Sequence, residues 1–392
     1  MKKPIYLNNC LTSKPAPEVI EAMLPYWQEK FYFPENFMSQ GTQIESDIEK
    51  YKQVVADSIN AKPDEIHFTT GGTSANNLAI KGYLMANSHK GNHIICSRVD
   101  YPDLLTNAAF FEKSGFEVTY LDADEEGFID LKQLQQAIKP ETIMFMTTWA
   151  NHTTGTLQPI EQISKILQKA DHKIAFHVDA GQAYGKVPIN VEEMKIDLLS
   201  VSAHKIHGPV GIGAMYVRQG IKLAPTKHGI NRIDEYETGG INIGLIAGFA
   251  KAVELNFSNF NENNAKLRQL SDYLLKKIEA TIPYTLLNGP RGDKRAPHNV
   301  NISFRYIEGE AIMMMLDAAG IIVATGSACF SKGLSPNYIL MAIGRNHEES
   351  HGSMKFTLSR YNTKEEIDYT VEKLAEIVSE LRKRSPLYKE EK

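Results

Sequence analysis

The regular alternation of strand and helix patterns between about residues 45 and 220 is the feature that most constrains how this chain can fold. Apolar side chains recur at helical spacing over residues 44–59, and a strand pattern follows at 65–69 before a helix that starts near Thr73. Further strand patterns, several separated by helical stretches at 131–138 and 160–169, lie at residues 93–96, 117–121, 143–147, 174–178 and 198–202. This alternation predicts an α/β fold with a mostly parallel sheet and crossover helices.

A second, smaller lobe is predicted toward the C-terminus. Helix patterns dominate residues 248–282, which we expect to bridge the two lobes. A strand at 299–304, a helix at 309–318, a strand at 354–358 and a helix at 364–382 follow. The chain has 392 residues, whereas single cores stop growing at roughly 250–300 residues. We therefore predict a large domain of residues 14–255 and a smaller α/β domain of residues 1–13 and 256–392.

Composition and charge narrow the classes of function. The formal net charge is −4, so nothing predicts a basic face for nucleic acid or a polybasic patch for a membrane. No apolar run reaches the ~18 residues that a membrane span needs. The two lysines at the N-terminus are not followed by the apolar stretch of a signal peptide, and we expect a cytoplasmic protein.

The three cysteines, Cys10, Cys96 and Cys329, are too few for a disulfide framework, and no CxxC pair predicts a zinc site. A cysteine taken singly is most often a small buried hydrophobe. Cys329 differs, because it lies among small and polar residues of loop composition, where a cysteine is exposed more often than buried. The nearby Lys332 would favour its thiolate, which is the reactive form.

Asp179 follows the strand pattern at 174–178, so it is expected at the carboxyl end of a strand, where open α/β sheets bind their ligands. A buried carboxylate needs a cationic partner, and the protonated pyridine nitrogen of pyridoxal 5'-phosphate (PLP) is such a partner. The alternative is an aspartate that caps the next turn.

Lys205 follows the next predicted strand, together with Ser202 and His204. A hydroxyl and an imidazole suit a phosphate group, and a lysine amine suits an aldehyde carbon. Most lysines lie at the surface. The spacing of 26 residues after Asp179, with the flanking serine and histidine, favours a Schiff-base lysine that carries PLP.

A third segment supplies a possible phosphate cradle. The strand pattern at 65–69 runs into Gly71-Gly72, and a helix should begin at Thr73. Free amides at a helix N-terminus bind phosphate. Glycine turns before helices are common, so this segment alone does not predict phosphate binding. The prediction depends on Asp179 and Lys205, which indicate a cofactor that carries a phosphate.

The segments 177–180, 202–209 and 325–329 resemble the class V PLP-dependent enzymes, specifically the cysteine desulfurases of the NifS/IscS type. The resemblance covers nearly the whole chain. It implies the fold of PLP-dependent aminotransferases (fold type I) and a homodimer with sites near the subunit interface. It also implies conversion of L-cysteine to L-alanine, with the sulfur passing to Cys329 as a persulfide and then to an acceptor such as an iron–sulfur scaffold protein.

The resemblance gives individual residues their expected roles. Lys205 would carry the cofactor, Asp179 would pair with the ring nitrogen, and Gln182 would bond the ring oxygen. The phosphate would be held by Gly72, Thr73, Ser202 and His204. Cys10 and Cys96 match no functional position of the family, and core packing is the expected role of Cys96.

Several positions depart from the family pattern. Tyr101 stands where the family stacks a histidine on the cofactor ring, and His152 replaces an asparagine beside the ring oxygen. In the loop that reaches the partner subunit, Gly240 stands where a phosphate-binding threonine is usual, and Thr238 is the candidate substitute.

The position that usually binds the substrate carboxylate is also changed. Lys355 stands where the family has an arginine, and a lysine cannot make the bidentate contact of a guanidinium. Arg360 lies nearby in the sequence and is a second candidate. These departures leave two alternatives open: another class V enzyme, such as an aminotransferase or lyase for a different amino acid, and a non-catalytic relative that takes part in sulfur transfer.

Residues 347–351 match the zinc-protease pattern HExxH, which requires both histidines on one face of a continuous helix. Gly344 precedes the segment and Gly352 follows it at once, and it has no apolar stripe. We therefore expect neither a helix of that kind nor a metal site here.

Overall fold

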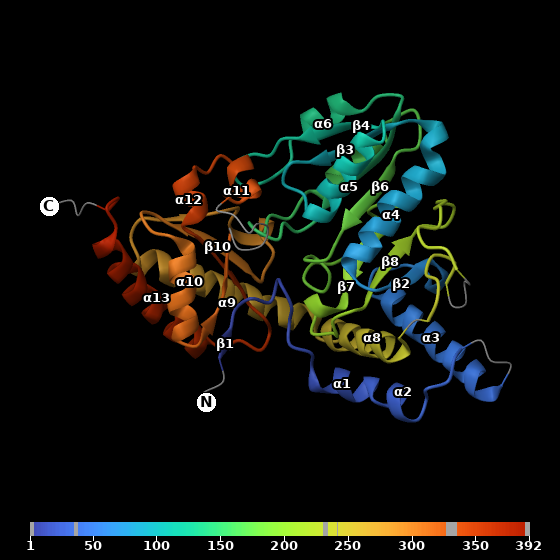
Figure 1. The fold of residues 1–392 in the computed structure, drawn as a ribbon, viewed down its shortest axis with the longest axis horizontal. Helices are drawn as coiled ribbons and strands as arrows, with labels where there is room; N and C mark the ends of the chain where they lie inside the picture. The colour runs from blue at the N-terminus through green and yellow to red at the C-terminus, as the bar shows by residue number, and fades with distance from the viewer. Residues whose placement is uncertain (1–3, 35–37, 230–233, 241, 327–334, 389–392) are drawn as a thin grey trace.

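The computed structural model describes residues 4–34, 38–229, 234–240, 242–326 and 335–388 (Figure 1). Its large part is built on one seven-stranded sheet with the order β2-β8-β7-β6-β5-β3-β4. The strands are β2 (Ile66–Thr69), β3 (His93–Ser97), β4 (Glu117–Leu121), β5 (Thr142–Thr148), β6 (Ala175–Asp179), β7 (Leu198–Ser202) and β8 (Gly213–Val217). All neighbours are parallel except β8, which is antiparallel to both β2 and β7. β8 reverses direction because a loop of residues 203–212, and not a crossover helix, joins it to β7.

Helices cover both faces of this sheet. Successive strand residues face opposite sides, so Met144 and Met146 pack with one cluster while Phe145 packs with the other. The first cluster includes residues of α4 (Gly72–Asn87) and α5 (Pro102–Lys113). The second takes residues from α1 (Pro17–Met23), α2 (Pro25–Gln28), α3 (Ser39–Asp57), α6 (Leu131–Ala137), α7 (Ile160–Leu167) and α8 (Ile243–Phe257). Buried parallel strands with helices on both faces are the predicted layer arrangement.

The smaller part has its own sheet and core. Antiparallel strands lie in the order β12 (Ala324–Thr325), β13 (Ser353–Thr357), β10 (Asn299–Phe304) and β9 (Thr285–Leu287). One sheet face packs on α9 (Phe260–Thr281), α10 (Gly309–Ala318) and α13 (Lys364–Arg384). The other face is polar, with Asn301 paired directly opposite Lys355. Near the N-terminus, β1 (Ile5–Tyr6) pairs with β11 (Ile321–Ile322), so residues from both ends of the chain build this part.

Three details differ from or refine the sequence expectations. The helical stretch 248–282 is two helices, α8 and α9, separated at Ser258 and Asn259, because α8 packs on the large core and α9 on the small one. Residues 347–351, where no continuous helix was expected, form α12 (His347–His351), a helix of one turn after α11 (Tyr338–Ala342), capped by Asn346 and ended at Gly352. The domain limits at 13/14 and 255/256 stay a prediction, although α8 ends close to the second. Short 3-10 turns occur at Pro63–Glu65, Ser88–Lys90, Ala203–Lys205 and Gly292–Lys294.

No helix in these described ranges is long and apolar enough to cross a bilayer.

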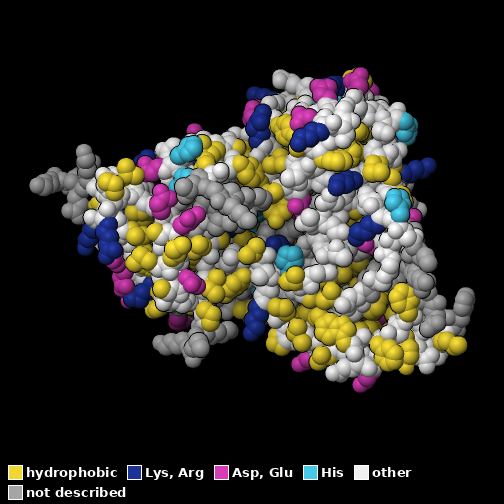
Figure 2. Space-filling view, viewed as in Figure 1, with side chains coloured by type: hydrophobic (Ala, Val, Ile, Leu, Met, Phe, Trp, Pro, Cys, Tyr) yellow, Lys and Arg dark blue, Asp and Glu magenta, His cyan; other side chains and the backbone are white. Residues whose placement is uncertain are grey.

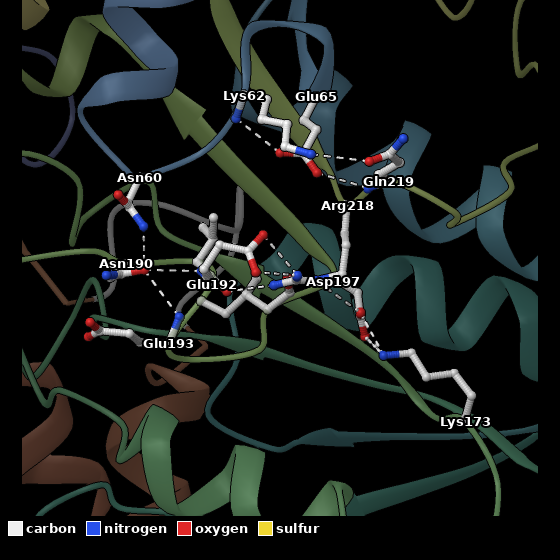
Figure 3. Close-up of polar contacts among 12 residues, drawn as sticks. Asn60, Lys62, Glu65, Lys173, Asn190, Glu192, Glu193, Asp197, Arg218 and Gln219 are labelled. Atoms are coloured by element: carbon white, nitrogen blue, oxygen red, sulfur yellow. Dashed lines mark hydrogen bonds and ion pairs between the residues drawn. The ribbon is translucent and has the colours of Figure 1, made fainter.

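A buried carboxylate fixes the register of three central strands at the amino end of β7 (Figure 3). Asp197 is about 1% exposed, and its carboxylate accepts a hydrogen bond from the Phe176 N–H at 2.9 Å and from Lys173 Nζ at 2.6 Å. Arg218, just after β8, donates its backbone N–H to the Asp197 carbonyl and pairs with Glu192 at 2.8 Å. These contacts join β6, β7 and β8 at the edge of the sheet where β6 and β7 begin, opposite the carboxyl ends of those two strands.

Replacement of Asp197 by alanine should destabilise the large sheet by about 2–4 kcal/mol, because the Phe176 N–H and the Arg218 guanidinium lose a buried partner. Lys173→Ala is the matched control and should lose less stability, since Lys173 is 61% exposed and Asp197 keeps the Phe176 N–H and the Arg218 guanidinium at 3.6 Å. Guanidinium unfolding of both variants measures the difference. Equal losses in the two variants would contradict this role of Asp197.

Candidate active site

The carboxyl ends of β2, β5, β6 and β7 open on a cleft of about 480 Å³. Parallel strands bring these ends to one edge of the sheet, which is where ligands of open α/β sheets bind. The cleft contains many of the residues predicted from the sequence: Gly72, Thr73, Tyr101, Asp179, Gln182, Ser202, His204 and Lys205. It also contains Asn76, Asp103 and Thr148, which the sequence interpretation did not single out.

Gly72 and Ser202 form a cradle suited to phosphate. The Gly72 N–H donates to Ser202 Oγ at 3.0 Å, where α4 begins. A Cβ at position 72 would displace that hydroxyl, so glycine lets the turn approach Ser202 closely. The preceding Gly71 has φ +138°, which side-chain-bearing residues rarely adopt. The turn therefore places free amides of the α4 N-terminus beside a serine hydroxyl.

Asp179 is buried at the end of β6 with only partial compensation for its charge. It accepts hydrogen bonds from Asn76 Nδ2 at 3.0 Å and from the Gly181 N–H at 2.8 Å. Burial nevertheless raises the pKa of Asp179 to about 6. A cationic group in the cleft would relieve this desolvation, which fits a protonated pyridine ring.

The amine of Lys205 points toward the N-terminal segment. Lys205 Nζ donates to the Cys10 carbonyl at 2.5 Å and to the Leu11 carbonyl at 2.8 Å. Gln182 Nε2 donates to the same Cys10 carbonyl at 2.9 Å. Residues near the start of the chain thus hold the side chains of Lys205 and Gln182, which no pattern around Lys205 predicted.

A second lysine lies directly behind Lys205 and was also missed. Lys186 Nζ donates to the Lys205 carbonyl at 3.1 Å. Burial, together with the Lys205 amine, lowers the pKa of Lys186 to about 7. Burial likewise lowers the pKa of His204 to about 4, with Lys205 as the next cause, so this imidazole is neutral at pH 7.

Tyr101 and His152 lie against each other, with ring centroids 4.8 Å apart at an interplanar angle of 81°. The Tyr101 N–H donates to Thr148 Oγ1 at 2.7 Å, which fixes the turn after β3 to the end of β5. The buried Asp100 accepts from Thr148 N–H at 2.6 Å and from Ser97 N–H at 2.7 Å. Burial raises the pKa of Asp100 to about 7.

The remaining predicted residues lie outside the set that lines the cleft. Lys355 is buried on the polar face of the small sheet, opposite Asn301. Arg360 contacts the Leu255 carbonyl at 3.4 Å and the Tyr361 hydroxyl at 3.2 Å. Thr238 lies near Gly229. Cys329 falls outside the described residues, so its role stays a prediction.

The residues at the HExxH segment do not converge on a common point. The rings of His347 and His351 have centroids 6.4 Å apart, and His351 pairs with Glu308 at 3.9 Å. Among the residues that the structure describes, no group of three or more His, Cys, Asp or Glu is placed to hold a metal ion.

Comparison with known families matches residues 5–370 to the family described as Aminotransferase class-V. The chain belongs to this family, as its motifs predicted. It is 44% identical over 391 residues to a protein of Dictyoglomus turgidum named "Cysteine desulfurase IscS", with 100% of this chain and 98% of the relative covered.

Solved structures extend the likeness to the fold. A chain titled "NIFS-LIKE PROTEIN" superposes with a TM-score of 0.91 at 28% identity, covering 96% of this chain and 100% of the other. A chain titled "SspA in complex with cysteine" superposes with a TM-score of 0.80 at 30% identity, covering 92% and 100% respectively. The predicted fold class is confirmed.

The raised pKa of Asp179 predicts a specific pH dependence of PLP binding. Ring-nitrogen pairing needs the carboxylate, and below pH 6 the cofactor-free protein holds Asp179 protonated. The affinity advantage of the wild type over Asp179→Asn should therefore shrink by up to about tenfold per pH unit below pH 6 and level off above it. Absorbance titration of both proteins with PLP measures this. An advantage that is equal at every pH would contradict the pairing.

Proposed function

We propose that this protein is a PLP-dependent cysteine desulfurase, which converts L-cysteine to L-alanine and transfers the sulfur to Cys329. The observation that carries the proposal is the meeting of Lys205, Asp179 and the Gly72–Ser202 cradle in one cleft. These three elements match the aldehyde, ring nitrogen and phosphate of PLP in their chemistry. The chain's relatives at 40–44% identity that carry the name cysteine desulfurase support the same reaction.

The proposed cofactor contacts follow from the positions of the side chains. Lys205 Nζ would hold the aldehyde carbon, and Asp179 the ring nitrogen. The phosphate would lie against Gly72, Thr73, Ser202 and His204 at the start of α4. Tyr101 would face the ring, and Gln182 and His152 would flank its oxygen. Bound PLP supplies an electron sink for the bonds to the substrate's α-carbon.

The chain's own residues would then perform the remaining tasks. Lys205 would move a proton at the substrate carbon, and its carbonyl accepts a hydrogen bond from the neighbouring Lys186 amine. Lys355 would receive the substrate carboxylate as a single cationic contact. The Cys329 thiolate would take the sulfur, so that the substrate's C–S bond breaks, an S–S bond forms and alanine remains.

Alanine release from L-cysteine in the presence of a thiol reductant tests the proposal. The PLP-loaded wild type should produce alanine steadily, and Cys329→Ser should abolish turnover while retaining the yellow colour of bound PLP. Lys205→Ala should lose both the colour and the activity, because the cofactor has lost its attachment.

Two outcomes would redirect the assignment. Turnover that survives Cys329→Ser would exclude a persulfide on that residue. A yellow protein that releases no alanine would favour another class V reaction on a different amino acid, and a colourless protein would favour a non-catalytic relative in sulfur transfer.

We also propose that the protein is a homodimer. Hydrophobic side chains gather over α1, α2 and the segment that follows them (Figure 2). The exposed members of this patch are Ile20, Leu24, Trp27, Phe31, Tyr32, Phe33 and Met38. Trp27 Nε1 donates to Asn242 Oδ1 at 3.2 Å, so the patch borders the loop that carries Thr238. An apolar surface beside that loop is suited to contact with a second copy, whose cleft Thr238 would reach.

Substitution of Trp27 by glutamate should convert the dimer to a monomer, because a charge at the centre of the patch would be buried without a partner. Met314→Glu on α10 is the control, since Met314 is 67% exposed, against 51% for Trp27, and lies outside the patch. Light scattering on a sizing column gives the mass. A wild-type monomer, or equal behaviour of both variants, would exclude this interface. The cytoplasmic location and an iron–sulfur scaffold as acceptor stay predictions.

A further inference from the structure

The Gln182 side chain is held between two segments that meet at the cleft. Gln182 follows β6, is buried and lines the cleft. Its Nε2 atom donates to the Cys10 carbonyl at 2.9 Å, and its Oε1 atom lies 3.3 Å from Nε2 of His298. The amide therefore has a partner at each of its two ends, one from the N-terminal segment and one from the residue before β10.

His298 is a buried residue of the smaller part, and no pattern in the sequence predicted a role for it. It is 1% exposed, and its carbonyl accepts from the Leu358 N–H at 2.9 Å, which holds it beside the end of β13. His298 is not among the residues that line the cleft. Its imidazole therefore acts on a ligand there through the Gln182 amide and not by direct contact.

The hydrogen-bond partners decide how the amide and the imidazole are oriented. A carbonyl only accepts, so the Gln182 atom that faces Cys10 is the amide nitrogen, and the amide oxygen faces His298. Nε2 of His298 must then carry a proton, because two lone pairs would otherwise face each other. Burial holds the pKa of His298 well below the usual value, so the neutral ring has only this proton. Its Nδ1 atom, which lacks a hydrogen-bond partner within the described residues, is then an acceptor and not an unsatisfied N–H donor.

The same arrangement occurs a second time beside the cleft. Nε2 of the buried His177 lies 3.1 Å from Asn76 Oδ1, and Asn76 Nδ2 donates to Asp179 at 3.0 Å. An ionised carboxylate only accepts, so here too a histidine holds the amide oxygen while the amide N–H faces the site. Two side-chain amides of the cleft are thus each turned by a buried histidine, which favours positioning over simple packing as the role of His298.

We propose that His298 is a positioning residue that holds the Gln182 amide with its N–H side toward the ring oxygen of PLP. The proposal rests on the proposed function, since it takes PLP as the occupant of the cleft. The amide nitrogen has two N–H bonds, and the Cys10 carbonyl accepts from one of them, which leaves the other for the ring oxygen. Without His298 the amide oxygen loses its buried donor, and the amide can turn its oxygen toward the ring oxygen. An N–H at that place stabilises negative charge on the ring oxygen, whereas an amide oxygen repels it.

The absorbance of the PLP-loaded, full-length protein as a function of pH tests this role. The yellow band changes when the Schiff base loses its proton, and the ring oxygen then carries its negative charge without a neighbouring cation. Loss of the N–H donor in His298→Leu should therefore raise the pH of this transition, by up to about one pH unit. His298→Gln keeps an N–H near the place of Nε2 and should stay close to the wild type.

A double-mutant cycle separates positioning from a direct effect on the cofactor. Gln182→Leu should raise the transition pH by itself, and adding His298→Leu should raise it no further, because His298 acts only through that amide. Shifts that add in the double variant would overturn the proposal. A His298→Leu protein that titrates like the wild type would overturn it as well.

His93→Leu is the control for the loss of a buried, neutral histidine. His93 begins β3, at the end of that strand away from the cleft, and burial lowers the pKa of its imidazole to about 4. Both of its ring nitrogens contact threonine hydroxyls, at 2.7 and 2.9 Å. The His93→Leu protein should lose stability in guanidinium unfolding but keep the transition pH of the wild type. A shift as large as that of His298→Leu would overturn the specific role of His298.

The tautomer of His298 gives a second readout, which needs neither turnover nor cofactor. Nitrogen NMR of the cofactor-free, full-length protein should find the imidazole proton on Nε2 near neutral pH, and His298→Gln identifies the signals by their loss. A proton on Nδ1 would overturn the proposal, because nothing would then hold the Gln182 amide oxygen on the side of His298.

The proposed function and this inference can fail separately. A yellow protein that shows the expected shifts but releases no alanine would exclude the desulfurase reaction alone. Normal alanine release, with a transition pH that His298→Leu leaves unchanged, would exclude this inference alone. A wild type that binds no PLP would overturn both.

Discussion

The active site depends on the way the N-terminal segment ties the small sheet to the turn that carries Lys205. Thr357 on β13 donates its N–H to the Leu7 carbonyl at 2.7 Å, and its hydroxyl accepts from the Cys10 N–H. On the other side, Ser13 Oγ and Ser13 N–H both donate to the His204 carbonyl at 2.8 Å. These residues bridge the two parts, alongside other contacts such as the hydrogen bond from the Ala296 N–H to the Gly155 carbonyl at 2.7 Å. Lys355 and Lys205 lie 150 positions apart in the sequence, and both lower the pKa of the Cys10 thiol, which belongs to this segment.

The charges around the pocket determine which ligands it favours. Three lysines, Lys186, Lys205 and Lys355, lie close enough to affect the ionisation of one another or of the groups between them. Burial keeps the histidines His152, His204 and His298 neutral, so they add hydrogen-bonding capacity without further positive charge. Such a pocket is stabilised by anions, and a phosphate and a substrate carboxylate are anions of that kind. Asp179 supplies negative charge where the proposed ring nitrogen lies.

The sequence predicted the parts of this site that follow from strand direction. A residue at the carboxyl end of a parallel strand lies at the ligand-binding edge, so Asp179, Ser202 and Lys205 could be placed from local patterns alone. Cys10 could not, because it meets Lys205 across 195 positions and its surroundings in sequence look like an ordinary loop. Asn76 was missed for a different reason. It reads as one more polar residue of a helix, and only the packing of α4 on β6 turns its amide toward Asp179.

The departures from the family pattern at Tyr101 and His152 form a coupled pair, because the two rings lie against each other. Tyr101 keeps an aromatic face at the end of β3, held by Thr148. His152 meets it edge to face, and its neutral imidazole lies within the field of Lys205 and Lys355. A cation at position 152 would be repelled by both lysines, whereas a neutral ring is not. Burial, with Lys355 and Lys205 as the next causes, therefore keeps His152 uncharged, and the same two lysines lower the pKa of the Cys10 thiol.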